Sequence, residues 1–421
     1  MPLDLLARLD PLRRIRCPFC FARFAAYELH MRCDSPTCET DYARQIDDPI
    51  LSRVFQSPIR SPWWTDPPHD ANRGIRRYLD MIVLPGSLTC PFCEQPTDRH
   101  LCPRCHQWLP DDAITGSSGH ITVFGPQSVG KTTYLTVLLE EMGERVGPSR
   151  GWILEPLTED VRNRFKHEYR DVTYGSGGVG VGGDSHGDFS RHSHQPTANL
   201  KLDRRVLQPF IFKLKRRDAT GHPHLLSFSD MAGEDWEMDV QTLRREAGYL
   251  IREARGLLFL IDPLRLPQVA RDPRLHLTEK ERHVPPAEYK DDISKLAGFF
   301  PRTPSKVPLA ICLNKIDRWG PLMAEGTTLH DVARSVPLGP PDRRLDQLVH
   351  EEVKSALRHW DQLSFLEHLA IDFPNHRFFA CSALGDAAQE REDVPQPLPT
   401  PLLVDRPILW LLEQQKLITS R

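Results

Sequence analysis

Beyond about residue 120, short apolar runs alternate with longer segments whose apolar residues recur at helical spacing. Short apolar runs that end at polar or glycine residues are typical of buried strands, and the longer periodic segments are typical of amphipathic helices. Their alternation predicts an α/β fold with a mostly parallel sheet and helices on both faces. The predicted strands are residues 120–124, 209–214, 225–228, 256–261, 308–313 and 377–380.

The first 112 residues follow a different pattern, with few periodic segments and many cysteine, proline and aromatic residues. The segment Thr115-Gly-Ser-Ser-Gly119 is interpreted as a hinge before the α/β pattern, because glycine and serine favour irregular backbone. Stretches near residues 160–200 and 266–303 are longer than ordinary connections and are interpreted as insertions. In the first of them, residues 174–194 are rich in glycine and histidine, and a flexible loop is favoured there over a metal site.

Composition excludes a few classes of protein. The net charge is −3, so no global attraction to nucleic acid or to an acidic membrane surface is expected. Asp4 and Asp10 interrupt the apolar residues of the N-terminus, which argues against a secretory signal. The best apolar run, residues 256–261, is too short to cross a bilayer. We therefore expect a cytoplasmic protein with no membrane span.

A phosphate-binding loop is predicted at residues 125–132, which read Gly-Pro-Gln-Ser-Val-Gly-Lys-Thr. Such a loop points successive backbone N–H groups at an anion, and glycine allows the backbone to approach closely. Lys131 is expected to reach the β- and γ-phosphates, and the Thr132 hydroxyl to bind Mg²⁺. The residues expected around the phosphates are Gly125, Ser128, Val129, Gly130, Lys131, Thr132 and Thr133.

The flanks of this loop favour the phosphate site over a chance glycine-rich turn. A predicted strand enters the loop, and a predicted helix leaves it and stops at Gly147-Pro148. The apolar face of that helix carries Leu135, Leu138, Leu139 and Met142. The loop does not choose a base, because ATPases and kinases share it.

Two further motifs follow predicted strands. Asp230-Met-Ala-Gly233 follows strand 225–228 and has the chemistry of a strand-end aspartate that binds Mg²⁺. Asn314-Lys315-Ile316-Asp317 follows strand 308–313. A carboxylate at Asp317 accepts hydrogen bonds from the ring N–H and the exocyclic amine of guanine, whereas adenine lacks that pair of donors. The sequence thus favours a guanine nucleotide.

These motifs, in this order, resemble those of the Ras-like, translation-factor-related (TRAFAC-class) P-loop GTPases. Ser382-Ala383, after the last predicted strand, resembles a further motif of that family, and the resemblance extends over about residues 120–420. It implies that Asp230 holds Mg²⁺ through water, that the Gly233 N–H senses the γ-phosphate, and that the Lys315 stem lies along the base. Bacterial members of the double-GTPase type, linked to conflict systems, are similar in their insertions and fused modules.

The sequence departs from this family at two places. The family usually has Gln after the Asp-x-x-Gly motif, where this chain has Glu234. A carboxylate accepts a proton from water but donates no hydrogen bond unless it is protonated, so Glu234 either positions water or pairs with an arginine. The predicted catalytic set is Glu234, Lys131 and Gly233. The family's switch threonine, a further Mg²⁺ ligand, is assigned to Thr197, with Thr173 as second choice, and no arginine finger is assigned.

Eight of the ten cysteines form four close pairs before residue 106. In a reducing compartment such pairs are metal ligands more often than disulfides, and four thiolates complete the tetrahedral shell of structural Zn²⁺. One site is predicted at Cys90, Cys93, Cys102 and Cys105, and a second, looser one at Cys17, Cys20, Cys33 and Cys38. His30, His100 and His106 are alternative ligands that four cysteines make unnecessary, and Cys312 and Cys381 are interpreted as core residues.

The predicted organisation is a zinc ribbon at residues 1–50, a linker with a four-cysteine ribbon at 51–112, and a P-loop GTPase domain at 118–421. Arginines interleave with aromatic residues in the first module, which suits nucleic acid. Aromatic residues around zinc knuckles more often form the small core of such a module, so a protein effector or regulator is the favoured partner.

The function predicted from the sequence is a Mg²⁺-dependent GTP switch that hydrolyses GTP slowly or with a partner's help, and whose zinc modules dock that partner. The expected cofactors are GTP or GDP, Mg²⁺ and one or two Zn²⁺. One alternative is a zinc-ribbon adaptor whose nucleotide domain is a docking platform. Another is a P-loop ATPase in which the Asn-Lys-x-Asp motif occurs by chance.

Overall fold

The structure is a computed structural model that describes residues 13–55, 57–65, 88–174, 209–217, 222–231, 233–246, 248–300, 304–335, 343–385 and 399–418. The chain divides into two compact units. The first, the cysteine unit, comprises Met1–Gly119, Ala198–Lys215 and Ala219–Ser227. The second, the nucleotide unit, comprises His120–Thr197, Arg216–Asp218 and Phe228–Arg421. In the described part of the chain, no helix combines the length and the apolar character needed to cross a membrane.

A seven-stranded sheet has the order β11-β12-β13-β10-β14-β15-β16. The pairs β10–β14, β14–β15 and β15–β16 are parallel, and every residue of β14 and β15 is buried. Parallel strands with both faces covered need apolar residues at consecutive positions, which is why they read as continuous apolar runs. The bounds are β10 Ser117–Phe124, β11 Trp152–Pro156, β12 Phe210–Arg216, β13 His224–Asp230, β14 Gly256–Ile261, β15 Leu309–Leu313 and β16 His376–Ala380.

All six strands predicted from the sequence are present, and β11 was not predicted. Its sequence, Trp-Ile-Leu-Glu-Pro, is short and mostly half-buried, and it lies at the end of the sheet order. An end strand lacks the continuous burial that makes the central strands recognisable. The boundary predicted at residues 115–119 is confirmed, because the two units divide after Gly119. The predicted irregular backbone is wrong, because α5 (Asp111–Thr115) occupies its start and β10 begins at Ser117.

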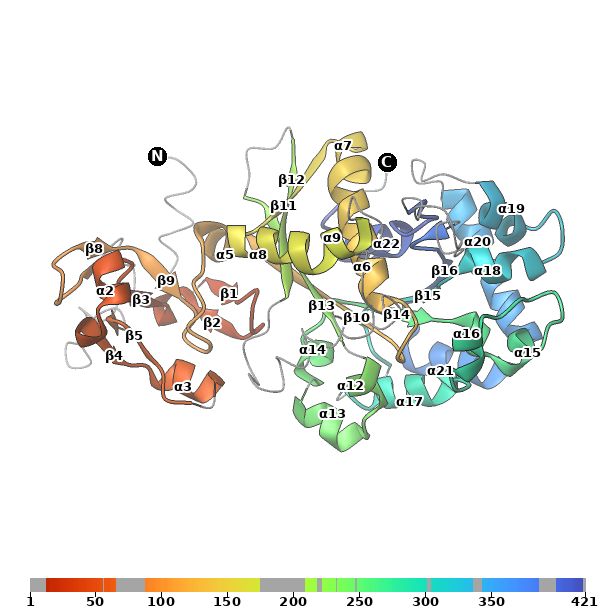
Figure 1. Cartoon of the computed structure of the whole chain (residues 1–421), viewed down its shortest axis with the longest axis horizontal. Helices are drawn as coiled ribbons and strands as arrows, with labels where there is room; N and C mark the ends of the chain where they lie inside the picture. The colour runs from red at the N-terminus through yellow and green to blue at the C-terminus, as the bar shows by residue number, and fades with distance from the viewer. Residues whose placement is uncertain are drawn as a thin grey trace. The chain divides into compact units, whose positions relative to one another are not determined.

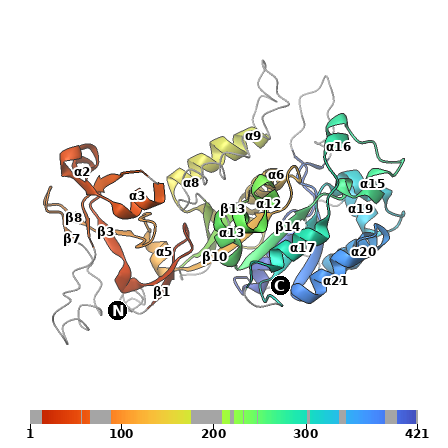
Figure 2. The same cartoon turned by 90° about the horizontal axis from the view of Figure 1, so that it is seen from below.

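Helices lie on both faces of the sheet, as predicted. In Figure 1, α6 (Lys131–Glu141) and α22 (Arg406–Gln414) lie above the central strands, and α13 (Val240–Glu246), α17 (Tyr289–Ala297) and α21 (Leu363–Asp372) lie below them. The view from below shows α20 (Arg343–His359) beside α21 (Figure 2). The other helices of this part are α12 Gly233–Glu237, α14 Gly248–Arg252, α18 Ile316–Trp319, η6 Gly320–Leu322 and α19 Thr328–Ser335.

The helical segment after the phosphate loop ends at Ser149, one residue beyond the predicted stop at Gly147-Pro148. A π-helical segment, η3 (Met142–Val146), connects α6 to α7 (Gly147–Ser149), and the Gly147 N–H donates to the Met142 carbonyl. A Cβ on Gly147 would lie 2.5 Å from that carbonyl oxygen, so glycine is required there. The wider turn accommodates Pro148, and the chain leaves the helix at Gly151, where φ is +72°.

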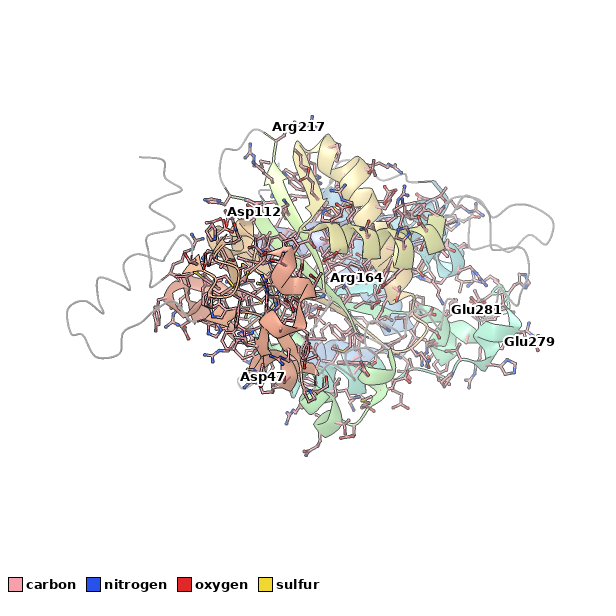
Figure 3. The ribbon with its side chains drawn as sticks, turned by 60° about the vertical axis from the view of Figure 1, so that its left-hand side comes forward. Asp47, Asp112, Arg164, Arg217, Glu279 and Glu281 are labelled. Atoms are coloured by element: carbon pink, nitrogen blue, oxygen red, sulfur yellow. The ribbon has the colours of Figure 1, made fainter. Side chains whose placement is uncertain are left out.

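Both predicted insertions contain regular structure. The first has α8 (Glu159–Arg164), η4 (Phe165–Arg170) and α9 (Asp171–Tyr174), after which the glycine- and histidine-rich tract lies outside the described residues. The second begins after η5 (Pro263–Arg265) with α15 (Pro267–Ala270), α16 (Glu279–His283) and α17. Glu279 and Glu281 on α16 are labelled in Figure 3. Glu281 accepts from the Thr278 N–H at the start of α16 and pairs with Arg318, which fixes this short helix.

The cysteine unit contains a three-stranded sheet in the order β6-β3-β9 and small two-stranded sheets. Strand β3 (His30–Arg32) pairs antiparallel with β9 (Arg99–Leu101) and with β6 (Trp64–Thr65). The other elements before residue 110 are β1 Arg14–Arg16, β2 Arg23–Ala25, η1 Ala26–Glu28, α2 Pro36–Thr40, η2 Tyr42–Arg44, β4 Gln45–Asp47, α3 Pro49–Phe55, β5 Arg60–Pro62, β7 Leu88–Thr89 and β8 Pro96–Thr97.

Candidate nucleotide site and cysteine clusters

The loop after β10 has the backbone of an anion-binding turn. Gly125, Ser128 and Gly130 have φ values of 150°, 62° and 85°, and Gly130 immediately precedes the first residue of α6. A Cβ on Gly125 would lie 2.5 Å from the Leu260 carbonyl oxygen, so glycine is needed there. Ser128 holds a left-handed conformation that costs a non-glycine residue about 1–3 kcal/mol. A strained loop that curls onto a helix N-terminus is suited to bind phosphate.

Lys131 lies inside this loop. Its Nζ donates to the carbonyl oxygens of Gly125 at 2.9 Å and Pro126 at 2.8 Å, and the residue is 7% exposed. Burial lowers the pKa of Lys131 to about 8, and the negative charge of Asp230 opposes that change. The loop carbonyls hold the ammonium group where an anion bound to the loop would meet it.

Thr132 and Asp230 lie together at the predicted Mg²⁺ site. Thr132 Oγ1 donates to Asp230 Oδ2 over 2.6 Å. Asp230 Oδ1 is buried and has no hydrogen-bond partner among the described residues, and burial raises the pKa of this carboxyl group. Buried polar atoms are rarely left unsatisfied, and Mg²⁺ prefers carboxylate and hydroxyl oxygens. The residues present therefore fit a hard cation.

Gly233 begins α12 and lies directly against the phosphate loop. A Cβ on Gly233 would lie 2.4 Å from the Cα of Gln127, so no larger residue fits without movement. The backbone of Glu234 is in α12, and its side chain lies outside the described part of the structure, as does Thr197. Thr173, the second candidate for the switch threonine, is half-buried in α9.

The second insertion holds the far end of α12. Trp236 Nε1 donates to Asp292 Oδ1 over 2.7 Å, and burial raises the pKa of Asp292 to about 6. Lys295 Nζ donates to the carbonyl oxygens of Trp236 and Met238 at 2.5 and 2.6 Å. A cation at carbonyls near a helix C-terminus is favourable, so α17 stabilises the helix that contains Gly233.

The predicted base-binding residues lie at the ends of β15 and β16. Asn314 Nδ2 donates to the Val129 carbonyl over 2.9 Å, which ties this motif to the phosphate loop. Asp317 Oδ1 is buried without a hydrogen-bond partner in the described chain. Burial raises the pKa of Asp317, and the nearby Ser382 hydroxyl opposes this rise. Ser382 Oγ also accepts from the Gly385 N–H over 2.9 Å, which shapes the Ser-Ala turn.

The sequence analysis did not identify two residues that follow β14, Asp262 and Arg265. Lys315, whose φ is 60°, pairs through Nζ with Asp262 Oδ2 at 2.6 Å. Arg265 Nη1 donates to the Gln127 carbonyl over 3.1 Å. Ligands of open α/β sheets bind at the carboxyl ends of the strands. The one feature that could have identified Asp262 and Arg265 is their position after a central strand, because the other central strands end in motifs that the sequence identified.

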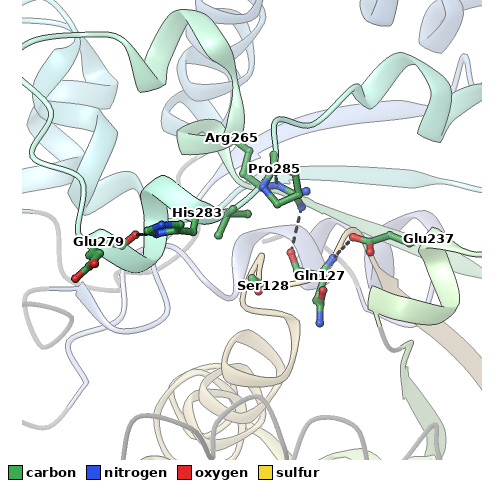
Figure 4. Close-up of a pocket in the computed structure, with 8 residues that line it drawn as sticks. Gln127, Ser128, Glu237, Arg265, Glu279, His283 and Pro285 are labelled. Carbon is green, nitrogen blue, oxygen red and sulfur yellow. Dashed lines mark hydrogen bonds between the residues drawn. The ribbon is translucent and has the colours of Figure 1, made fainter.

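A cavity of about 580 Å³ adjoins the phosphate loop (Figure 4). The Gln127 N–H donates to Glu237 Oε1 over 3.1 Å, so Glu237 and Arg265 bind the N–H and the carbonyl of the same residue. Ser128 and residues of the second insertion form the remaining wall. The lining residues are Gln127, Ser128, Glu237, Arg265, Glu279, His283, Val284 and Pro285.

The eight N-terminal cysteines form two clusters, but not the two that the sequence predicted. One is Cys17, Cys20, Cys102 and Cys105, and the other is Cys33, Cys38, Cys90 and Cys93. The grouping of Cys90 and Cys93 with Cys102 and Cys105 is therefore wrong. Because β3 and β9 run antiparallel, Cys102 at the end of β9 lies near the start of β3, and Cys33 at the end of β3 lies near the start of β9. Each cluster takes one pair from each half of the unit.

Three of the four pairs share one turn. Phe21, Glu94 and His106 follow the second cysteine of their pairs and have φ values of 58°, 58° and 52°. The N–H of each donates to the carbonyl oxygen of the first cysteine over 2.9–3.0 Å. The Sγ atoms of Cys17 and Cys102 accept backbone N–H bonds from Phe19 and Arg104 at 3.4 Å, which stabilises thiolate charge.

The sulfur spacing fits Zn²⁺. Four sulfurs at about 2.3 Å from one tetrahedral ion lie about 3.8 Å apart. The measured Sγ–Sγ distances are 3.8 Å for Cys17–Cys105 and 3.7 Å for Cys20–Cys102. In the second cluster they are 3.6 Å for Cys33–Cys93 and 3.9 Å for Cys38–Cys90. Each cluster can hold one metal ion.

Two of the three candidate histidine ligands, His30 and His106, form a network separate from the cysteine clusters. His106 Nδ1 lies 2.8 Å from Asp48 Oδ2, and His30 Nδ1 lies 2.8 Å from His106 Nε2. The Asp48 carboxylate also accepts the Leu51 N–H near the start of α3, and Trp64 stacks on His30. This network joins α3 to the cysteine pairs and accounts for His30 and His106 without metal.

No family model matches the chain. It is 27% identical over 361 residues to a protein described as "Putative ESX-1 scaffolding and assembly protein SaeC" of Mycolicibacterium smegmatis, an alignment that covers 77% of this chain and 78% of the relative.

The chain spans about half the length of the solved structures that it matches, and the similarity is weak. The GTP-bound Ski7 GTPase-like domain of S. cerevisiae has a TM-score of 0.31 and 13% identity, with 72% of this chain and 51% of that chain covered. Era of Aquifex aeolicus bound to GDP and fluoroaluminate has a TM-score of 0.26 and 12% identity, with 71% and 57% covered.

Proposed function

We propose that this protein is a Mg²⁺-dependent guanine-nucleotide switch that hydrolyses GTP and carries a zinc-stabilised module for docking a protein partner. The observation that carries the proposal is the cluster of Lys131, Thr132 and Asp230, in which one buried Asp230 oxygen lacks a protein partner. Lys131 and the loop N–H groups would bind the phosphates, and Thr132 and Asp230 would hold Mg²⁺, directly or through water. When bound, the ion neutralises charge on the β- and γ-phosphates.

Guanine is the base that this site suits. Asp317 has a buried carboxylate oxygen without a partner in the described chain. It follows β15, which pairs with β16, the strand that precedes the Ser-Ala turn. Two N–H donors of guanine would satisfy it, whereas adenine would leave it desolvated and unpaired. The contact from Asn314 to Val129 links the base motif to the phosphate loop, so one nucleotide can engage both.

The cysteine unit would bind one structural Zn²⁺ in each cluster, because the sulfur spacings fit and neither cluster has an open position for catalysis. Four of its arginines pair with carboxylates, which weakens their attraction for nucleic-acid phosphate. Those pairs are Arg44–Asp41, Arg60–Asp47, Arg99–Glu39 and Arg104–Glu28. The scaffolding and assembly role in the relative's description also supports a protein partner.

The proposal is tested by measuring the binding of GTP, ATP and XTP to the full chain and to an Asp317→Asn variant. We expect GTP to bind far more tightly than ATP. In the variant, GTP should weaken about 10²-fold, because a charged hydrogen-bond pair is lost, and XTP should gain. Asp291→Asn, at an exposed position on α17, is the matched control. Tighter binding of ATP than GTP by the unchanged protein would refute the guanine assignment.

A further inference from the structure

Arg265 lies at the boundary between the sheet and the second insertion. It is the last residue of η5, the short helix that follows β14, and it is 8% exposed. Its guanidinium group forms part of the cavity wall beside Gln127 (Figure 4). The end of β14 therefore places a buried cation next to the phosphate loop.

Two hydrogen bonds orient this guanidinium group. Arg265 Nε donates to the Pro285 carbonyl over 3.0 Å, and Nη1 donates to the Gln127 carbonyl over 3.1 Å. Nη2 has no hydrogen-bond partner in the part of the chain that the structure describes. A guanidinium group has five N–H donors in a rigid plane, so fixing Nε and Nη1 also fixes the direction of the remaining donors.

Two buried cations contact the backbone of the phosphate loop. Lys131 Nζ donates to the Gly125 and Pro126 carbonyls, and Arg265 Nη1 donates to the Gln127 carbonyl. Two carboxylates, Glu237 and Glu279, also line the cavity, and Glu237 accepts the Gln127 N–H. Cations that the fold already holds in place stabilise negative charge that develops beside them during phosphoryl transfer.

We propose that Arg265 is an arginine finger supplied by the chain itself, which contacts the terminal phosphate of GTP. This inference rests on the proposed function and deepens it. In the reaction, the oxygen of water bonds to the γ-phosphorus, and the bond from that phosphorus to the bridging oxygen breaks with its electron pair on GDP. One proton of the water stays on the attacking oxygen and the other moves to another oxygen of the same phosphate, so the products are GDP and H₂PO₄⁻. Arg265 stabilises the negative charge on the transferring group, so no partner needs to supply this cation.

The test compares GTP hydrolysis in single turnover with the binding of GDP alone and of GDP with fluoroaluminate, a mimic of the transferring phosphoryl group. Arg265→Ala should slow hydrolysis about 10³-fold and abolish the gain in affinity from fluoroaluminate. The affinity for GDP alone should change less than about threefold, because the proposed contact is with the terminal phosphate. Arg265→Lys should recover part of the rate, and added guanidinium ion should partly rescue the alanine variant.

Arg271→Ala is the matched control, because Arg271 lies exposed at the end of α15 in the same insertion. Hydrolysis by Arg265→Ala at the unchanged rate would overturn the inference. So would equal losses of affinity for GDP and for GDP with fluoroaluminate, since that pattern indicates a structural clamp on Gln127. If the alanine variant does not fold, Arg265→Lys carries the same comparison. Failure of the unchanged protein to bind GDP would overturn the proposed function itself.

Discussion

The nucleotide unit and the cysteine unit place their ligand groups by opposite means. In the nucleotide unit, each motif follows its own strand. Parallel pairing of β10, β14, β15 and β16 brings the phosphate loop, the Asn-Lys-x-Asp motif and the Ser-Ala turn to one edge. In the cysteine unit, strands of only two or three residues carry the pairs, and each cluster joins residues more than 50 positions apart. The sheet positions a ligand in the first case, whereas the ligand holds the small sheets together in the second.

This difference predicts that metal loss and nucleotide loss have different consequences. Removing a structural metal from a small module removes much of its folding free energy, whereas an α/β core keeps its fold without the nucleotide.

The largest effect is expected from replacing four cysteines at once. Serine at positions 17, 20, 102 and 105 should remove one Zn²⁺ per chain, because these residues form one cluster. Serine at 90, 93, 102 and 105 should remove both ions, because it destroys half of each cluster. Native mass spectrometry measures the zinc content. The opposite result, one ion lost from the second variant and two from the first, would restore the grouping read from sequence spacing.

An intermediate effect is expected from pH. The pKa of Lys131 in the free protein is about 8, so the fraction of charged Lys131 falls about tenfold between pH 7 and pH 9. A phosphate ligand selects the charged form, and GDP affinity should fall by about that factor. Calorimetric titration at the two pH values measures it. In a Lys131→Arg variant the cation does not titrate, so an equally large fall there would exclude Lys131 as its source.

The same depressed pKa affects stability with a defined sign. Between about pH 8 and pH 10.5 the unfolded chain binds more protons at Lys131 than the folded chain, so the free energy of unfolding of the nucleotide-free protein should rise with pH across this window. Denaturant titration at several pH values measures that rise. Its presence in Lys131→Met would show that another group is responsible.

The smallest effect is expected at the ion pair between Lys315 and Asp262. Asp262→Asn keeps an oxygen that can accept the Leu264 N–H, as Oδ1 does now, and removes the charge that faces Lys315 Nζ. Because Lys315 is partly exposed, solvent screens the pair, and we expect GDP affinity to fall about fivefold or less. A loss as large as that in Asp317→Asn would mean that Asp262 also contacts the nucleotide.

Local patterns were enough to predict the central sheet and the order of its motifs. Burial on both faces requires continuous apolar runs at β14 and β15. The positive φ values of Gly125 and Gly130, and the atoms packed against them, require glycine in the phosphate loop. Arg265 and Asp262 were missed because no local pattern distinguishes them from other polar residues after a strand. Their positions depend on how the second insertion folds back to Pro285.

The grouping of the cysteines could not be predicted, for a different physical reason. Sequence spacing favours joining neighbouring pairs, because closing a short loop costs less entropy than closing a long one. That cost grows only slowly with loop length, so the pairing of His30 with Leu101 and of Arg32 with Arg99 is enough to reverse the preference.

The antiparallel pairing of β3 with β9 also determines when each cysteine cluster can form during translation. When Cys17, Cys20, Cys33 and Cys38 leave the ribosome, they belong to two different clusters, and each cluster has only half of its ligands. The cluster that contains Cys33 cannot close until Cys93 has been made, and the other must wait for Cys105. Translation therefore continues for 60 residues after Cys33 before Cys93 completes its cluster, a period in which a zinc donor or a chaperone can bind the cysteines already made.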